Sequence, residues 1–259
     1  MPQNQPASSS HRIGFISTRL AGNDGVSLET KKWVEVLEGI NNTCFFLAGS
    51  SDWNPERSRI VPEAYFQHPE ILEISNEIFD QPLRSPSTSA RITQLQAFLK
   101  TQLYRFVKEY WIDLLIVENA LSIPMNIPLG LAITELIAET GIPTIAHHHD
   151  FYWERKRFLV NCGWDYLNMA FPPNLPSIHH VVINSAAAHQ LSHRRGISST
   201  LIPNVMDFDH PPAAPDDYTL DVRQALGINA GEWLFLQPTR IVPRKEIEHA
   251  IELTRRIDG

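Results

Sequence analysis

Three adjacent histidines and an aspartate, Ala146-His-His-His-Asp150, form the densest group of side chains that could bind a ligand or move a proton. They follow a short apolar run, so we expect them at the carboxyl end of a buried strand. Because side chains alternate along a strand, His147 and His149 should share one face and His148 the other. The residue types leave three interpretations: a metal site, a polar cluster contacting a sugar or phosphate, or a structural hydrogen-bonded set. The metal site has the least support, because no second ligand motif follows Asp150.

Two cations in the run Thr239-Arg-Ile-Val-Pro-Arg-Lys-Glu246 suit a second kind of chemistry. The pattern places Arg240 at the end of a strand and Lys245 in the first turn of a helix, with Pro243 at the helix start. Two cations at a helix N-terminus suit a diphosphate, whose charge needs several donors at once. The alternative is that they are ordinary surface cations.

The loop Gly22-Asn-Asp-Gly25 separates a predicted strand from a predicted helix. Backbone N–H groups at such a helix start favour anions, and an open parallel sheet places its ligand crevice there. Asn-Asp-Gly is also ordinary turn chemistry, and the G-x-G-x-x-G dinucleotide fingerprint is absent. We predict that this loop and residues 147–150 face the same crevice.

Predicted strands and helices alternate along the first 205 residues, and these elements must position the candidate residues. Their strands are apolar throughout, which is typical of a parallel sheet covered on both faces. We therefore predict an α/β, Rossmann-like, doubly wound parallel sheet. Predicted strands cover 13–16, 45–48, 114–117, 143–146, 181–183 and 200–202, and predicted helices cover 26–39, 92–110, 129–137 (closed by Gly141) and 186–194.

The composition divides the chain into four parts. Residues 1–11, rich in Pro, Ser and Gln, are predicted to be a disordered tail, and 12–205 form the Rossmann-like domain. Residues 206–230, rich in proline and acid, are predicted to be a linker. Residues 231–259 are predicted to start an incomplete second α/β domain, with a predicted strand at 233–236 and a predicted helix at 245–257. One strand and one helix cannot bury their own apolar faces.

Composition also excludes several protein classes. A net charge of -7 in 259 residues argues against a protein that binds nucleic-acid phosphates. Two cysteines cannot form a disulfide framework, and the N-terminus lacks the features of a signal peptide. No apolar run is long enough to span a bilayer. We expect a cytoplasmic protein, for which peripheral membrane contact stays open.

Taken together, five motifs resemble the family-4 retaining glycosyltransferases, whose GT-B fold has two Rossmann-like domains. The resemblance runs along nearly the whole chain from Ile13. It implies an acceptor-side domain followed by the start of a donor domain. The motifs are Gly25-Val-Ser-Leu-Glu29, His147 to Asp150, Val182-Ile-Asn-Ser185, Ile202-Pro-Asn-Val205 and Arg240 to Lys245.

The resemblance assigns roles to individual residues. Arg240 and Lys245 match the pair that grips the donor diphosphate, and Gly25 matches a glycine that approaches the donor phosphate. One histidine of the 147–149 cluster matches the histidine near the transferred sugar. We assign His149 to this position. Our candidate sites are therefore His149 and Asp150 as catalytic residues, Gly25, His147, Arg240 and Lys245 as substrate-binding residues, and no metal or cofactor.

The implied activity is a retaining glycosyltransferase of the hexosyltransferase type. It would move a sugar from a nucleotide diphosphate sugar to a small-molecule, glycan or lipid-linked acceptor. Two features depart from the family: Glu246 replaces the usual glycine, and the Glu-x7-Glu donor motif has no counterpart. We therefore expect the chain to be inactive alone. The alternatives are a metal-dependent hydrolase using His147, His149 and Asp150, and a non-catalytic fragment that binds nucleotide sugars.

Overall fold

A computed structural model describes residues 10–206, 208, 214–239, 241–242 and 245–257. The chain forms two compact units, Met1–Val205 and Met206–Gly259. Most of the predicted tail and Arg240 lie outside the described residues. Among the described residues, no helix combines the length and the apolar character that a membrane span requires.

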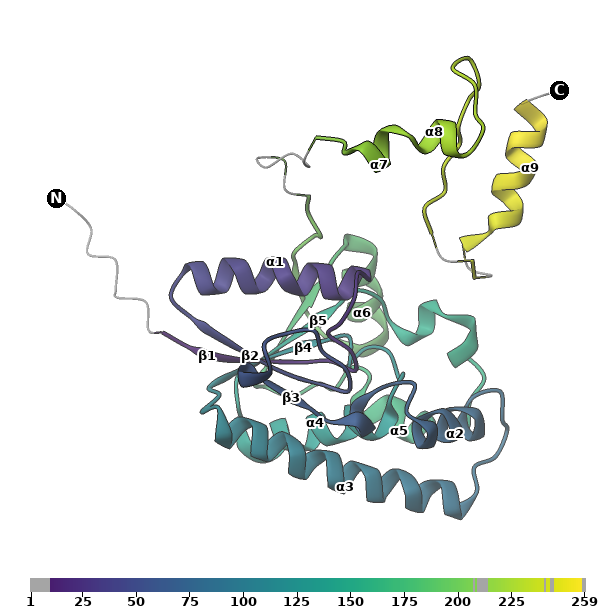
Figure 1. The fold of residues 1–259 in the computed structure, drawn as a ribbon. Helices are drawn as coiled ribbons and strands as arrows, with labels where there is room; N and C mark the ends of the chain where they lie inside the picture. Colours follow the sequence, from purple (N-terminus) through teal and green to yellow (C-terminus); the bar gives the residue numbers. More distant parts are fainter. Residues whose placement is uncertain (1–9, 207, 209–213, 240, 243–244, 258–259) are drawn as a thin grey trace. The chain divides into compact units, whose positions relative to one another are not determined.

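The first unit is built on a parallel sheet in the order β3-β2-β1-β4-β5-β6-β7 (Figure 1). This confirms the predicted doubly wound sheet. The chain runs outward from β1 to β3 and then returns to place β4 beside β1, so the switch point lies between β1 and β4. The strands are β1 (Arg12–Ile16), β2 (Thr43–Ala48), β3 (Ser58–Ile60), β4 (Leu114–Glu118), β5 (Thr144–His148), β6 (Ile178–Val182) and β7 (Thr200–Leu201).

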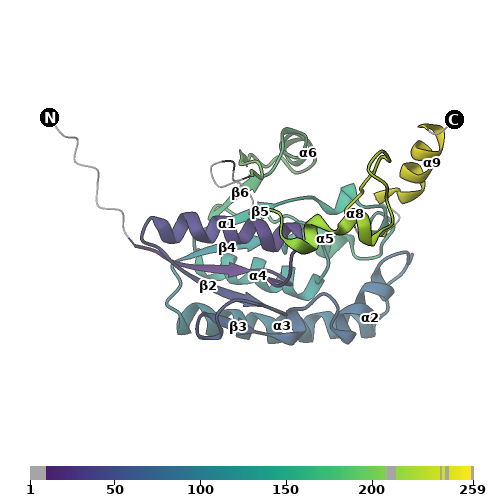
Figure 2. The same ribbon diagram turned by 45° about the horizontal axis from the view of Figure 1, so that its top comes forward.

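Helices cover both faces of this sheet, with α1 on one side and α3 and α4 on the other (Figures 1 and 2). α4 ends at Gly141, whose φ of 64° is the left-handed conformation predicted for a glycine stop. The helices are α1 (Gly25–Gly39), α2 (Pro69–Ile78), α3 (Pro86–Glu109), α4 (Ile127–Thr140), α5 (Trp164–Ala170) and α6 (Ser185–Arg195). Short 3-10 turns are η1 (Pro55–Arg57), η2 (Pro62–Ala64), η3 (Tyr152–Glu154) and η4 (Lys156–Phe158).

Apolar residues on alternate strand positions pack against these two helical layers. Ile16 and Val117 belong to a cluster that contains buried residues of α3 and α4 such as Leu103. Phe15 and Ile116, one position earlier in each strand, join Val34 of α1 in a different cluster. Each such large side chain contributes roughly 1.5–3 kcal/mol when buried. The strands are therefore apolar on both faces, which fixes their placement inside the layers.

The second unit departs from the prediction. Residues 233–236 form no strand among the described residues, and Trp233 and Leu236 are 88% and 75% exposed. A strand needs a neighbour for its backbone hydrogen bonds, and the described part of this unit contains none. The segment predicted as a linker holds α7 (Asp217–Leu220) and α8 (Val222–Ala225), and the last helix, α9, covers Ile247–Ile257.

A buried histidine pair joins β5 to β6 on the sheet face opposite His147. The rings of His148 and His180 meet with Nε2 and Nδ1 2.9 Å apart, and both residues are almost fully buried. Burial lowers the pKa of His180 to about 4, and neighbouring His179 acts in the same direction. Burial also lowers the pKa of His148 well below its usual value. Burial of this pair therefore favours the neutral form of both rings.

We expect stability to fall as pH falls from about 6.5 to about 4. In this pH window His180 binds a proton in the unfolded chain but stays largely unprotonated in the folded chain, so protonation favours unfolding. Above pH 6.5 the penalty is absent, and at pH 4 it reaches about 3 kcal/mol for His180 alone. Urea unfolding at several pH values measures this loss of stability. His180→Leu should flatten the profile, whereas exposed His193→Leu should keep it; equal profiles for all three proteins would contradict this account.

Candidate functional site

The carboxyl ends of β1, β4 and β5 meet at the switch point of the sheet. In the register, Ile16 pairs with Val117, and Glu118 pairs with His147. The Ser17 hydroxyl, directly after β1, donates to the Glu118 carbonyl oxygen at 3.1 Å. The loop after β1 and the histidine run after β5 therefore lie at one edge of the sheet, where open α/β sheets bind ligands.

The centre of this edge is a carboxylate between two imidazoles. Glu118 Oε2 lies 3.0 Å from His147 Nδ1 and 3.1 Å from His149 Nε2. His148 faces the other side of the sheet, so the predicted alternation is confirmed. Glu118 is not among the site residues predicted from the sequence. Its only local signal is a single charged residue ending an otherwise apolar strand, Leu114–Glu118.

The cluster is held in a dry environment. The side chains of Glu118 and His147 are 0% exposed, and that of His149 is 10% exposed. Burial alone would raise the pKa of Glu118, but the contacts with His147 and His149 outweigh burial and lower it. Trp33 of α1 stacks on the His147 ring, with ring centroids 4.6 Å apart. α1 therefore covers the cluster and keeps His147 from water.

Asn119, the residue after Glu118, holds the backbone of the two strand ends together. Its N–H donates to the His147 carbonyl at 3.0 Å, and its side-chain Oδ1 accepts from the His149 N–H at 2.9 Å. Its φ is 58°, a left-handed conformation that Asn tolerates better than most residues. These contacts fix the position from which the His149 side chain leaves the strand.

Asp150 does not join the cluster. Its carboxylate accepts a hydrogen bond from Arg155 Nε at 2.6 Å and forms an ion pair with the same guanidinium. The predicted set of His147, His149 and Asp150 is therefore not assembled, and Glu118 occupies the acidic position beside the two histidines. Glu118, His147 and His149 each offer one donor atom within 4.8 Å of the others, a separation that suits either a metal ion or mutual hydrogen bonds.

The start of α1 contains its own anion. Asp24 Oδ1 accepts from the backbone N–H groups of Val26 and Ser27, and its Oδ2 accepts from Arg19 at 2.7 Å. Partial burial acts to raise the pKa of Asp24, but the hydrogen bond from the Ser27 hydroxyl, the Arg19 guanidinium and the Ser27 backbone N–H lower it below its usual value. Gly25 is the first residue of α1. A phosphate approaching Gly25 would therefore meet a carboxylate that already uses the helix N-terminus.

The predicted diphosphate site has one described member. Lys245 is exposed in the second unit, and Arg240 lies outside the described residues. Glu246, the departure from the family pattern, contacts His249.

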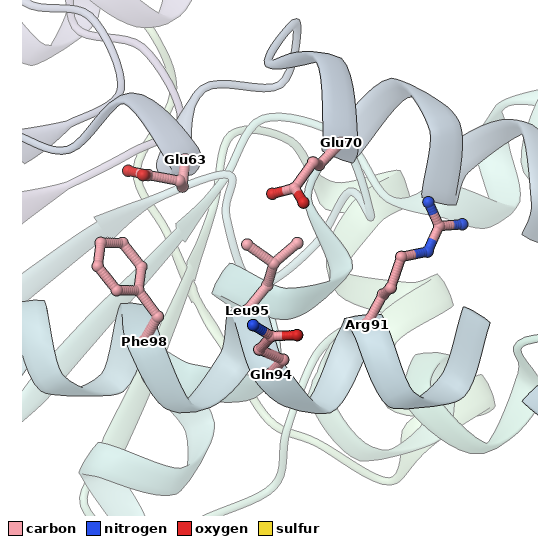
Figure 3. A pocket seen from close by; sticks show the side chains of 6 residues that line it. All are labelled: Glu63, Glu70, Arg91, Gln94, Leu95 and Phe98. Carbon is pink, nitrogen blue, oxygen red and sulfur yellow. The ribbon is translucent and has the colours of Figure 1, made fainter. Parts of the chain in front are cut away.

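A separate cavity of about 150 Å³ opens between η2, α2 and α3 (Figure 3). It contains none of the predicted site residues. Arg91, which lines it, is held by ion pairs with Glu73 and Glu77 of α2. This cavity is therefore not part of the candidate site at the sheet edge. The lining residues are Glu63, Glu70, Arg91, Gln94, Leu95 and Phe98.

Two curated relatives match nearly all of this chain. The mannosylglucosylglycerate synthase of Petrotoga mobilis is 34% identical over 255 residues, which cover 93% of this chain and 55% of that protein. The enzyme of the same name from Thermotoga maritima is 34% identical over 247 residues, covering 93% and 56%. This chain is similar to mannosylglucosylglycerate synthases. It spans about half the length of these relatives.

The other comparisons are weaker. No family model matches the sequence. A solved alpha-glucosyltransferase in complex with UDP and DNA shares 13% identity with this chain. The match covers 61% of this chain and 35% of the glucosyltransferase, and its TM-score is 0.33. That score is too low to bear on the fold or the function.

Proposed function

We propose that this chain is part of a glycosyltransferase that moves a sugar from a nucleotide diphosphate sugar to an acceptor. The observation that carries the proposal is the 34% identity with two mannosylglucosylglycerate synthases across 93% of the chain. The position of the Glu118–His147–His149 cluster at the switch point of the sheet supports it, because that edge is where such folds bind ligands.

We assign the first unit to the acceptor side and Lys245, with Arg240, to the donor diphosphate. His149 would contact the sugar being transferred, since it is the one histidine of the cluster that is not fully covered. The protein would position the acceptor hydroxyl beside the leaving diphosphate and stabilise the developing charge with the two cations. Transfer with retention at the anomeric carbon is part of the proposal.

The relatives' name indicates the acceptor class. It describes a product that contains mannosyl, glucosyl and glycerate units. We infer an acceptor that is a glucosylated hydroxy acid, which carries sugar hydroxyls and a carboxylate. A metal-dependent hydrolase is not favoured, because Asp150 is paired with Arg155 outside the cluster and the relatives are synthases.

A transfer assay tests the proposal. Nucleotide diphosphate mannose and glucose donors are each mixed with glucosylglycerate, and the products are detected by mass spectrometry. Two proteins are compared: this chain, and this chain fused to the remaining half of the Thermotoga maritima synthase. We expect the fusion to form a product and the chain alone to bind acceptor without transfer. Absence of both acceptor binding and transfer in the two proteins would contradict the proposed function.

The donor assignment makes its own prediction. Replacing Arg240 or Lys245 by alanine in the fusion should weaken donor affinity by about 1–3 kcal/mol each, the range for a charge-assisted hydrogen bond. Calorimetric titration of the nucleotide sugar measures this. Exposed Arg255→Ala on α9 is the control and should leave the affinity unchanged. Unchanged affinity in the double variant would remove both residues from the donor site.

A further inference from the structure

We propose that Glu118 is a positioning residue that holds His149 in the tautomer with its hydrogen on Nε2, leaving Nδ1 to accept a hydrogen bond from a sugar hydroxyl. The identity of the ligand rests on the proposed function. The tautomer rests on the geometry of the cluster alone.

Glu118 has the hydrogen-bonding needs of a buried carboxylate. Glu118 is fully buried, and an ionised carboxylate can only accept hydrogen bonds. A buried charge without partners is costly, so its oxygens need donors. Two ring nitrogens lie at hydrogen-bond distance, His147 Nδ1 at 3.0 Å and His149 Nε2 at 3.1 Å. Both nitrogens must therefore carry a hydrogen.

This assignment leaves one free nitrogen on each ring. For His147 it is Nε2, which is buried without a partner among the described residues and lies in a ring stacked on Trp33. For His149 it is Nδ1, which makes no hydrogen bond within the described part of the chain. Only the His149 side chain keeps any exposure, at 10%. His149 is thus the ring that a ligand can reach, and His147 packs the carboxylate in place.

A metal ion shared by the same three donors would require the opposite tautomers. The hydrogen of His147 would then move to Nε2, because Nδ1 would give its lone pair to the metal. That would place a buried N–H without an acceptor among the described residues, a rarer and costlier state than an unused lone pair. The hydrogen-bonded arrangement also explains both contacts of Glu118 without any added group. The geometry therefore favours the carboxylate as the group that sets the tautomers.

The experiment reads the tautomer directly. Long-range ¹H–¹⁵N NMR spectra of the ¹⁵N-histidine-labelled chain, assigned with single histidine variants, report which nitrogen of His149 carries hydrogen. Spectra are recorded for wild type, Glu118→Leu and Glu29→Gln. Glu29 is the matched control, because it is another buried carboxylate but pairs with Lys32. Circular dichroism and the His180 signals check that each variant folds.

We expect a pure Nε2–H form of His149 in wild type and Glu29→Gln, and a mixture of tautomers in Glu118→Leu. Calorimetry with glucosylglycerate should show about tenfold weaker binding for Glu118→Leu and no change for Glu29→Gln. If Glu118→Leu does not fold, Glu118→Gln replaces it. Its carboxamide presents a donor in place of one acceptor, so at least one of the two rings should change tautomer.

Three results would overturn the inference. These are hydrogen on Nδ1 of His149 in wild type, a stoichiometric metal whose chelation shifts the His147 and His149 signals, and an unchanged tautomer and affinity in Glu118→Leu. Failure of the proposed function would look different. Wild type would then bind no glucosylglycerate, while the NMR spectra would still show the Nε2–H form that depends on Glu118.

Discussion

Replacing His149 by alanine is expected to lower sugar transfer by the fusion protein about 100-fold, the scale of losing one positioned group at a reacting centre. His149 combines a fixed backbone, held by Asn119, with a ring oriented by Glu118. Removing the imidazole deletes the only group of the cluster that remains partly exposed. Initial rates at saturating donor and acceptor measure the loss. The fold should survive, because His149 is not part of the apolar core.

The matched control for this prediction is His189→Ala. His189 lies on the exposed face of α6, so its removal should leave transfer within about twofold of wild type. His147→Ala should instead lower stability, since it uncovers Glu118 and removes the ring under Trp33. A His149→Ala protein that transfers sugar at the wild-type rate would place the reacting sugar elsewhere.

Replacing Gly49 by alanine is expected to destabilise the first unit by about 3 kcal/mol, at the upper end of ordinary overpacking. Gly49 follows β2, and a Cβ built there would lie 2.1 Å from the backbone nitrogen of Tyr65 and 2.3 Å from its Cα. Backbone atoms cannot turn away as a side chain can. The loop after β2 or the segment at Tyr65 would have to move. The thermal midpoint should fall by about 10 °C.

Gly39→Ala is the matched control for Gly49→Ala. Gly39 ends α1, and a Cβ there meets nothing within 4 Å. Alanine favours helix over glycine, so this variant should match or slightly exceed wild-type stability. Thermal and urea unfolding of both variants make the comparison. Equal stability of the two variants would mean that Tyr65 does not approach Gly49 as closely as the structure describes.

The sequence patterns predicted the sheet because burial of a strand and the end of a helix depend on residues that are close together in the sequence. Apolar runs such as 13–16 and 114–117 must be buried on both faces, and Gly141 ends α4 because it adopts a left-handed conformation easily. β3 was missed because three residues are too few to show a period. The prediction of a strand at 233–236 was wrong for a different reason. Its residues have strand character, but pairing requires a neighbour that the described part of its unit does not contain.

The candidate site also depends partly on local sequence pattern and partly on tertiary structure. The sequence by itself determined that His147 and His149 share one face of a strand end, because side chains alternate with a period of two. Only the tertiary structure decided which acid they meet. Glu118 lies 29 residues before His147 and reaches it through the register of β4 and β5, whereas neighbouring Asp150 turns to Arg155. Periodicity specifies the face of a side chain, but its partner depends on which strands pair and in what register.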